Sequence, residues 1–126
     1  MSNFYEGAVI EVKIAGMIDH PGILVHDGLG WCVIHNSYIA GGVVISTLAD
    51  FAGNRKIHFS SRYRNTANPF LIVKNARLKL GTKWSPLYNC QHFVSDVCGL
   101  KPQSHDLNLI CALVASFSLA SMLVRR

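Results

Sequence analysis

The stretch "LYNCQHFV", residues 87–94, contains one cysteine between polar neighbours, with apolar residues at both ends. Such a cysteine can be a buried structural thiol, a metal ligand or a nucleophile. The residues around it predict a short helix over 90–99 that begins at Cys90. The first-turn N–H groups and the helix dipole would stabilise a thiolate there and lower its pKa, and they could also donate to an oxyanion. The position therefore suits a nucleophile, while simple core packing beside Phe93 is the other interpretation.

The other cysteines offer less chemistry. Cys32 falls in a predicted strand, Cys98 lies near the end of the predicted helix, and Cys111 belongs to an apolar tail. No pair has C-x-x-C spacing, and Cys90 with His92 does not make a ligand set, so neither a metal nor another cofactor is expected. The N-terminus lacks the charged start and apolar run of a secretion signal. We therefore expect a cytoplasmic, reducing location with free thiols.

A thiol nucleophile needs a base. His92 is nearest in sequence to Cys90, but two residues along a helix correspond to a rotation of about 200°. His92 should therefore point away from the sulfur, and the base must come from another element. The remaining candidates are His20, His26, His35, His58 and His105.

The first half of the chain predicts short strands. Residues 20–26 and 30–38 are rich in β-formers and flank Asp27–Gly28, a pair that favours a two-residue type I′ hairpin turn. Further strands are predicted at 7–14 and 42–47, where apolar and β-branched residues dominate. The elements that would position the histidines are therefore the two arms of a hairpin.

The register of this hairpin decides which histidines meet. With a two-residue turn, His20 lies directly opposite His35, and cross-strand Cβ atoms are about 5 Å apart. One imidazole could then act as a base and the other could orient it. A four-residue loop would instead put Ser37 opposite His20, with His35 as a diagonal neighbour. Asp19 faces the other side of the strand and is not expected to orient His20.

The second half of the chain predicts helices. Asn68 is a suitable N-cap and Pro69 a suitable first residue for a helix that continues to Gly81. Its expected apolar face consists of Ile72, Val73, Ala76 and Leu80. With 126 residues, half of them apolar, the chain should form one main domain. Strands followed by helices predict an α+β fold with an antiparallel sheet packed against helices.

The tail at 107–124 has no charged residue and is followed by Arg125–Arg126. Its length is at the lower edge for a membrane-spanning helix, which needs about 20 residues. A membrane anchor and a docked or interfacial helix remain open. We therefore divide the chain into a main domain, 1–104, and an apolar helical tail, 105–126.

The net charge of +5 suits an anionic surface such as a membrane, although it is often only a solvated face. The stretch at 55–64, "RKIHFSSRYR", mixes basic and aromatic residues in one strand or loop. Because it is a single short stretch, nucleic acid is not the expected partner. The sequence does not indicate an oligomeric state.

Together, the hairpin "HPGILVHDG", the following "VIH" and the later "NARLKLGTKWSPLYNCQHFV" resemble the lecithin:retinol acyltransferase family, including the H-Ras-like-suppressor phospholipases/acyltransferases. These are circularly permuted relatives of NlpC-type papain-like hydrolases. The family pattern is a strand H-W-A-I-Y-x-G-D-G, a strand ending V-V-H, and a helix start N-C-E-H-F-V. The resemblance covers about residues 5–99. Departures are Pro21, Gly22 and His26 in the first strand, and Gln91 where the family usually has Glu.

The resemblance implies a permuted papain-like fold and a role for each matched residue. Cys90 would be the nucleophile, His20 the base and His35 the residue that orients it. Asn89, Gln91 and His92 would support the site, and the backbone N–H of Cys90 would help to bind an oxyanion. The implied chemistry is acyl transfer or hydrolysis through a thioester acyl-enzyme, without a metal or another cofactor.

We therefore expect a cysteine-dependent hydrolase or acyltransferase that acts on an ester or amide, with an acyl lipid as the substrate and a membrane surface as a further partner. A peptidase or amidase of the wider NlpC-type group is a second hypothesis. A third is a non-enzymatic interaction module that keeps the fold and the motif. Reactivity of Cys90, and the distance from its sulfur to His20, would separate the enzymatic hypotheses from the third.

Overall fold

The computed structural model describes residues 3–63 and 67–124, and the side chains of all of these except 117–124. In chain order the elements are β1 (Val9–Ile14), β2 (Ile18–His26), β3 (Trp31–Ser37), β4 (Gly42–Thr47), α1 (Leu48–Ala52), β5 (His58–Phe59), α2 (Pro69–Leu78), α3 (Cys90–Val97) and α4 (Leu107–Val124). The five strands form one antiparallel sheet in the order β4-β3-β2-β1-β5. The predicted α+β class, with an antiparallel sheet packed against helices, is confirmed.

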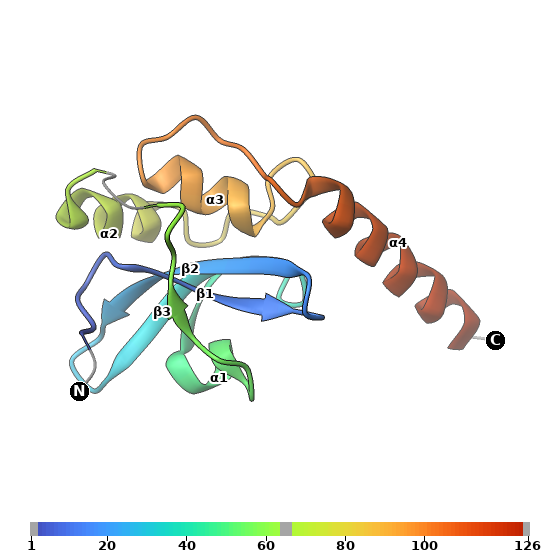
Figure 1. Ribbon diagram of the computed structural model, residues 1–126, viewed down its shortest axis with the longest axis horizontal. Coiled ribbons are helices and arrows are strands. Elements are labelled where there is room, and N and C mark those ends of the chain that lie inside the picture. The colour runs from blue at the N-terminus through green and yellow to red at the C-terminus, as the bar shows by residue number, and fades with distance from the viewer. Residues whose placement is uncertain (1–2, 64–66, 125–126) are drawn as a thin grey trace.

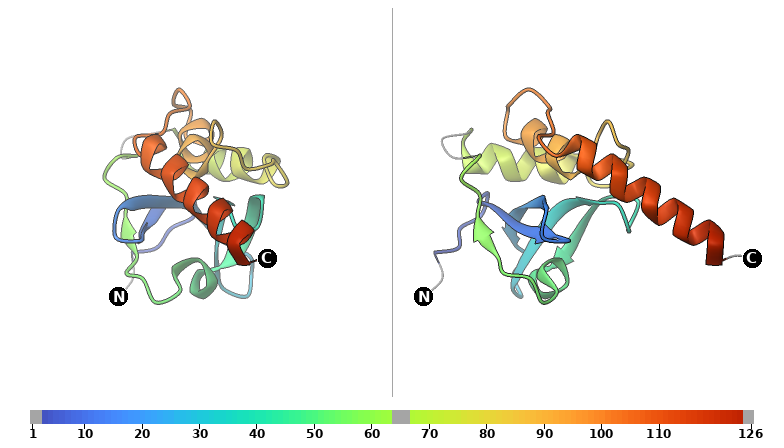
Figure 2. Two further views of the ribbon diagram at one scale, coloured as in Figure 1. Left: turned by 90° about the vertical axis from the view of Figure 1, so that its right-hand side faces the viewer. Right: turned by 45° about the vertical axis from the view of Figure 1, so that its right-hand side comes forward.

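The helices form layers on the two faces of the sheet (Figure 1). Helices α2 and α3 lie side by side over one face, while the short α1 lies on the opposite side, and the two views of Figure 2 agree with this arrangement. A core therefore forms on each face, and the alternation of side chains along the central strand β2 divides its residues between the two.

The larger core lies between the sheet and helices α2 and α3. Ile23 and Val25 of β2 contribute to it, together with Phe93 and Val94 of α3. Leu24, between these two strand residues, points to the second core, where Phe51 of α1 is buried. A third and smaller apolar cluster joins the start of β2 to helices α3 and α4, and it contains Ile18, Cys90 and Ile110.

The hairpin between β2 and β3 has the longer of the two predicted loops. His26 pairs with Trp31 and Ile23 with Ile34, which leaves residues 27–30 in the loop. The carboxylate of Asp27 accepts hydrogen bonds from the backbone N–H groups of Leu29 and Gly30, at 2.9 and 3.0 Å. These two bonds stabilise a wider Asx-type loop, so the two-residue register is wrong.

Helices α2 and α3 begin where the sequence predicts them. Asn68 caps α2 by accepting a bond from the N–H of Phe70, and Pro69 is the first residue. The helix ends at Leu78, earlier than the predicted end near Gly81, because the N–H groups of Lys79 and Leu80 turn back to carbonyls three residues earlier. Of the expected apolar face, Ile72 and Ala76 are buried, Val73 packs against the core, and Leu80 is exposed.

The basic stretch at 55–64 is mostly loop. Only His58 and Phe59 form a strand, β5, which pairs with β1 at the edge of the sheet. Arg64, the last residue of that stretch, lies outside the described residues.

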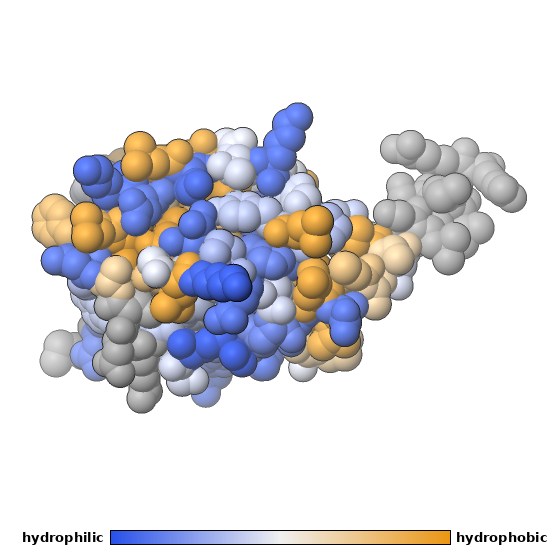
Figure 3. Space-filling view, turned by 90° about the horizontal axis from the view of Figure 1, so that it is seen from above, coloured by the Kyte–Doolittle hydropathy of each residue, from blue (hydrophilic) through white to orange (hydrophobic). Residues whose placement is uncertain are grey.

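Helix α4 has the bounds expected for the apolar tail, Leu107–Val124, and Arg125–Arg126 lie outside the described residues. Its first turns pack on the domain through Ile110, with Leu113 and Val114 beside it. The helix then extends away from the domain in both figures of the ribbon. From above, hydrophobic side chains gather where α4 leaves the domain (Figure 3). In the described part of the chain, no helix combines the length and the apolarity needed to cross a membrane.

Candidate active site

A cavity of about 280 Å³ lies at one end of the sheet, where β1 ends, β2 begins and β3 ends. Residues from both layers line it: Ile14, Ile18, His20, His35, Asn36, Ser37, Tyr38, Ile39, Asp50, Phe51, Arg55, Trp84, Cys90, Ile110, Leu113 and Val114. Its volume lies just below the usual range of small-molecule sites, about 300–1,000 Å³. The three residues assigned to catalysis on the basis of the sequence, Cys90, His20 and His35, therefore line one cavity.

The two histidines are in direct contact. The Nε2 atom of His20 lies 2.9 Å from Nδ1 of His35, and both side chains are buried. Continuing the observed register along β2 and β3 places the two residues diagonally, as expected for the four-residue loop. The ring of His20 also stacks on Phe51, with ring centroids 5.4 Å apart, so a residue of helix α1 packs against it as well.

A third residue extends this contact. Nε2 of His35 lies 2.9 Å from the hydroxyl oxygen of Ser46 on β4. If His35 donates to Ser46 through Nε2, its Nδ1 is an acceptor and receives a hydrogen bond from the Nε2–H group of His20. The other ring nitrogen of His20, Nδ1, then carries a lone pair, which is the form that a general base requires.

The site depends on a small residue between the histidines in sequence. A Cβ atom on Gly22 would lie 2.3 Å from Cγ1 of Val33, 3.1 Å from the ring of Phe51 and 3.3 Å from Cβ of His35. Gly22 therefore allows Phe51 and His35 to approach β2 closely. This explains in physical terms why the chain has glycine at a position where a side chain could not be accommodated without displacing the site.

Cys90 begins helix α3, as predicted, and its neighbours cap the helix. The side-chain oxygen of Asn89 accepts from the N–H groups of Gln91 and His92, at 2.9 and 3.2 Å. In return, Nδ1 of His92 accepts from the N–H of Asn89 at 3.1 Å. This reciprocal capping box gives His92 a structural partner away from the sulfur. Neither Asn89 nor His92 lines the cavity.

Burial affects the pKa of Cys90 more strongly than its position at the start of a helix does. The side chain is buried, and this burial raises the pKa of the thiol to about 12. The N–H groups of Gln91 and Cys90 act in the expected direction and lower the pKa, but the charges of Asp106 and Asp19 add to the rise. The prediction of a lowered thiol pKa is therefore wrong for this structure, because desolvation of a thiolate costs more than two N–H groups return.

Burial acts on the histidines as well. It lowers the pKa of His20 to about 3, with the positive charges of His35 and Arg55 acting in the same direction, and it lowers the pKa of His35 to about 4. Both imidazoles are therefore neutral near pH 7. Within the described residues, no hydrogen bond joins the sulfur of Cys90 to His20. The resting site consists of a neutral thiol and a neutral imidazole pair that face the same cavity.

Behind Cys90, the side chain of Gln91 is fully buried and uses both ends of its amide. Its nitrogen donates to the backbone carbonyl of Asp19 at 2.8 Å and to the carboxylate of Asp106 at 3.0 Å. Its oxygen accepts from the hydroxyl of Ser104 at 2.7 Å and from the N–H of Asp106 at 3.0 Å. Gln91 thus joins three segments: the start of β2, helix α3 and the residues that lead into α4.

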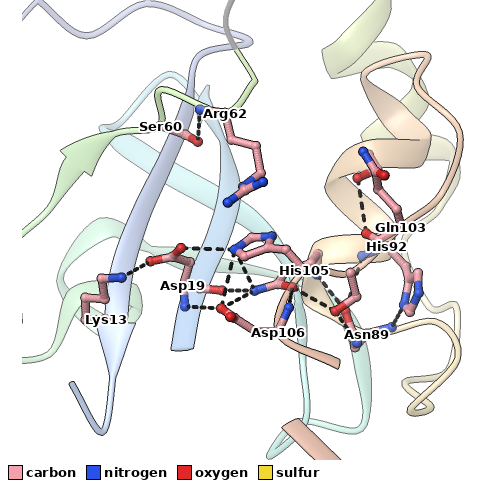
Figure 4. A network of polar contacts seen from close by, with 12 residues as sticks. Lys13, Asp19, Ser60, Arg62, Asn89, His92, Gln103, His105 and Asp106 are labelled. Carbon is pink, nitrogen blue, oxygen red and sulfur yellow. Dashed lines mark hydrogen bonds and ion pairs between the residues drawn. The ribbon is translucent and has the colours of Figure 1, made fainter. Parts of the chain in front are cut away.

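Figure 4 shows the polar contacts around this junction. Asp19 forms an ion pair with Lys13 at 2.6 Å and contacts Nε2 of His105 at 3.0 Å, so it does not orient His20. Burial acts to raise the pKa of Asp19, but hydrogen bonds from Lys13 and His105 outweigh it and the pKa is lowered. The network positions the segment before α4, whose first turns then form a wall of the cavity.

The same network contains a group of described residues that could act together as ligands of one metal ion: Asp19, His105 and Asp106. Their ligand atoms lie within 4.8 Å of one another. However, Lys13 already balances Asp19, and the amide of Gln91 already donates to Asp106. The cluster is therefore satisfied by the protein's own donors and serves as a junction.

Asn36 connects β3 to the cysteine loop. Its side-chain nitrogen donates to the carbonyl of Tyr88 at 2.8 Å and to that of Asn89 at 3.3 Å. Its Oδ1 atom is buried and has no hydrogen-bond partner among the described residues. The amide thus ties the strand that carries His35 to the residue that precedes Cys90.

The other candidate histidines lie elsewhere. His26 is exposed at the hairpin loop, with its ring 5.0 Å from that of Trp31, and His58 is exposed on the edge strand β5. His105 belongs to the junction behind Cys90. No disulfide joins any of the four cysteines, which are all among the described residues; Cys32 and Cys98 are buried outside the cavity and Cys111 is exposed on α4.

Sequence reasoning missed several lining residues, including Phe51, Arg55 and Trp84. It also missed Ser46, although this residue lies in a correctly predicted strand. A hydroxyl at a position diagonal to His35 was a usable signal, but it required the pairing of β3 with β4, in which His35 lies opposite Val44 and Ser46 opposite Val33. No protein-family profile matches this chain, and no curated protein matches it significantly.

Proposed function

We propose that this protein is a thiol-dependent hydrolase or acyltransferase that acts on an acyl ester or amide through a thioester acyl-enzyme. One observation carries the proposal. Cys90, at the start of a capped helix, and the hydrogen-bonded pair His20–His35 line the same cavity. A thiol, a neutral imidazole and a group that orients the imidazole are the parts that covalent acyl transfer requires.

The walls of the cavity support an acyl substrate. Apolar side chains predominate on the side formed by β1, β2 and α4, where Ile14, Ile18, Ile110, Leu113 and Val114 lie, with Trp84 nearby. An apolar wall next to a nucleophile suits a hydrocarbon chain better than a polar peptide. A lipid acyl group is therefore the preferred substrate class, and a peptide amide is the second.

In the proposed reaction, Nδ1 of His20 takes the thiol proton of Cys90 while Sγ bonds to the acyl carbonyl carbon. The backbone N–H of Cys90 donates to the oxyanion that forms. His20 then returns the proton to the leaving alcohol or amine as its bond to carbon breaks, which leaves a thioester. Water or an acceptor alcohol or amine attacks the thioester carbon while His20 accepts its proton. The bond from Sγ to carbon then breaks, and His20 returns the proton to Sγ, which restores the thiol.

In this mechanism, substrate binding must bring the reacting groups into place for proton transfer. The thiol is neutral at rest because burial raises its pKa to about 12, so proton transfer must accompany attack. A bound acyl group would bring the carbonyl to Sγ and complete the geometry, since catalytic hydrogen bonds often tighten only in the substrate complex. The proposal therefore assigns activation to the substrate complex and not to a resting thiolate–imidazolium pair.

The finer fold assignment belongs to the same proposal. We infer a circularly permuted papain-like domain of the lecithin:retinol acyltransferase type, on the basis of the order His20, His35, Cys90 and the Asn89–Val94 motif. The antiparallel sheet with α3 packed on it supports this assignment. Association with a membrane surface would fit the charge of +5 and the exposed apolar α4, and it forms part of the proposal.

The test is turnover of a fluorogenic phospholipid and of a short acyl ester by the purified protein. We expect Cys90→Ala and His20→Gln to lower turnover by at least about 100-fold, with Cys111→Ser, an exposed cysteine, as the matched control. Mass spectrometry should detect a hydroxylamine-sensitive acyl adduct on Cys90. Undiminished turnover by Cys90→Ala would reject the mechanism, and cleavage of peptidoglycan fragments but not of acyl esters would favour the peptidase.

A second candidate function, a non-enzymatic interaction module, is favoured by a specific observation. The high pKa of Cys90 and the lack of a hydrogen bond from it to His20 among the described residues are what a fold that had lost catalysis would show. A wild-type protein that turns over no ester or amide and forms no adduct with an acyl-transfer probe would support this candidate.

A further inference from the structure

The candidate active-site cavity has one charged edge. Two charged residues are among its lining residues, Asp50 in the first turn of α1 and Arg55 in the loop that follows this helix. The two histidines in the wall are neutral near pH 7, because burial lowers the pKa of each. The cavity therefore has an apolar side, near α4 and Trp84, and a side where a cation and an anion are available.

The charge of Asp50 has a structural role at the start of α1, and the charge of Arg55 has no such role. Asp50 lies at the N-terminus of α1, where an acidic side chain stabilises the first turn. Arg55 is exposed, and no residue of the described ranges forms an ion pair or hydrogen bond with its guanidinium. Its backbone is held by a bond from its N–H to the carbonyl of Ala52 at 3.0 Å. Within the described residues, the loop thus holds a cation at the cavity that has no ion-pair partner.

Arg55 lies close to the reacting groups. Its positive charge is one of the causes that lower the pKa of His20, after burial and the charge of His35. A ligand group that contacts Arg55 would therefore belong to the same bound molecule as a group that reaches His20 and Cys90. A guanidinium offers a planar fork of N–H donors that matches the oxygens of a phosphate or a carboxylate.

We propose that Arg55 binds an oxyanion, a phosphate or a carboxylate, on the same substrate whose acyl chain lies against the apolar wall of the cavity. This inference rests on the proposed function and names the residue that selects its substrate. Arg55 is then a specificity-determining residue: it contacts the charged part of the substrate, while Cys90 and His20 contact the carbonyl. The preferred substrates are anionic amphiphiles, and neutral esters of equal chain length bind more weakly.

The test measures binding without turnover, in the full chain with Cys90→Ala. The probes are octyl phosphate below its critical micelle concentration, 1-octanol and inorganic phosphate, titrated by calorimetry near pH 7. Arg55→Gln should weaken the binding of octyl phosphate by about tenfold or more, the effect of losing a charge-assisted hydrogen bond, and should leave 1-octanol unchanged. Arg55→Lys should retain part of the affinity, since it keeps the charge but loses the fork.

The matched control is Lys56→Gln, which removes the neighbouring exposed charge from a residue that does not line the cavity. Equal effects of Arg55→Gln and Lys56→Gln would overturn the assignment, and so would an equal loss for 1-octanol. Inorganic phosphate that binds as tightly as octyl phosphate would also overturn it, because the apolar wall would then contribute nothing. Since none of these measurements needs turnover, failure of the thiol mechanism and failure of the anion site are separate results.

Discussion

Nε2 of His20 lies 2.9 Å from Nδ1 of His35, although the two residues are not directly paired across the hairpin. The contact is diagonal, and the four-residue loop at 27–30 sets it. Histidine side chains are long enough to meet in either register, because diagonal neighbours on one face remain within reach of ring side chains. The two imidazoles therefore meet in the observed register, as they would in the register of a two-residue turn.

The first prediction concerns Ser46, which lies 2.9 Å from Nε2 of His35. Ser46→Ala removes the acceptor that holds the proton on this nitrogen, so His35 can take the other tautomer and donate to His20. His20 would then lose its free lone pair at Nδ1. We expect kcat to fall by about tenfold with little change in KM, as for loss of a single orienting hydrogen bond.

Ser46→Thr, which keeps the hydroxyl, is the control for this experiment, and kcat and KM are measured with a short acyl ester. A fall in kcat for Ser46→Ala that Ser46→Thr restores indicates orientation of the tautomer. A change in stability without a change in kcat would assign Ser46 a structural role only.

The second prediction concerns thiol reactivity. Burial raises the pKa of Cys90 to about 12, whereas Cys111 is exposed on α4. In the native protein at pH 7.5, iodoacetamide should modify Cys111 much faster than Cys90, Cys32 or Cys98, because the thiolate is the reactive form and access is needed. Peptide mass spectrometry over time measures the four rates.

An acyl-chain electrophile provides the second arm of this experiment. If the substrate complex activates Cys90, an octanoyl chloromethyl ketone should modify Cys90 faster than iodoacetamide does, and His20→Gln should remove this acceleration. Rapid modification of Cys90 by iodoacetamide itself would contradict the buried, neutral thiol described above.

The third prediction concerns pH. Because the pKa values of His20 and His35 are lowered to about 3 and about 4, the unfolded chain binds more protons than the folded chain between pH 4 and the ordinary pKa of 6.5. Stability must therefore rise with pH in this window. Each histidine should cost about 2 kcal/mol in the free energy of unfolding as the pH falls from 7 to 5.

Urea unfolding at pH 7, 6 and 5 measures this dependence. His35→Gln should flatten the profile, since it removes one of the two groups, while His58→Gln, at an exposed position on β5, should leave the profile as it is. A wild-type stability that does not change between pH 7 and pH 5 would mean that the imidazoles can be protonated in the folded state.

The fourth prediction concerns Gln91, where the resembled family usually has Glu. The amide nitrogen of Gln91 donates to the carboxylate of Asp106 and to the carbonyl of Asp19. Gln91→Glu replaces this donor with a second carboxylate in a buried position. We expect a loss of about 2–4 kcal/mol in the free energy of unfolding at pH 7, because like charges and lost hydrogen bonds act together.

The partner of this variant is Asp106→Asn, which removes the opposing charge. The double variant should recover part of the lost stability, and the coupling between the two changes is obtained from a double-mutant cycle by urea unfolding. Additive effects of the two substitutions would show that Asp106 does not disfavour a carboxylate at position 91.

The fifth prediction concerns Gly22, where an added Cβ would lie 2.3 Å from Val33 and 3.1 Å from Phe51. Gly22→Ala should lower the free energy of unfolding by about 1–3 kcal/mol through overpacking, and it should weaken turnover by displacing His35. Gly30→Ala is the matched control, because nothing lies within 4 Å of a Cβ at Gly30. Equal stability of the two variants, by thermal unfolding, would remove the steric argument.

The sequence by itself determined the starts of two helices and the position of several strands. Asn68–Pro69 and Asn89–Cys90 marked the starts of helices α2 and α3 correctly, because capping depends on a few adjacent residues. The strand at 42–47 was also placed correctly. The His20–His35 contact followed from two predicted strands and the turn between them, all within a short stretch of chain.

Only the tertiary structure decided what depends on long-range packing. The pKa of Cys90 depends on burial beneath β2 and α4, which outweighs its favourable position at a helix start. The presence of Arg55 at the cavity depends on how α1 folds back over the sheet. Desolvation and cavity shape are sums over residues distant in sequence, so no local pattern contains them.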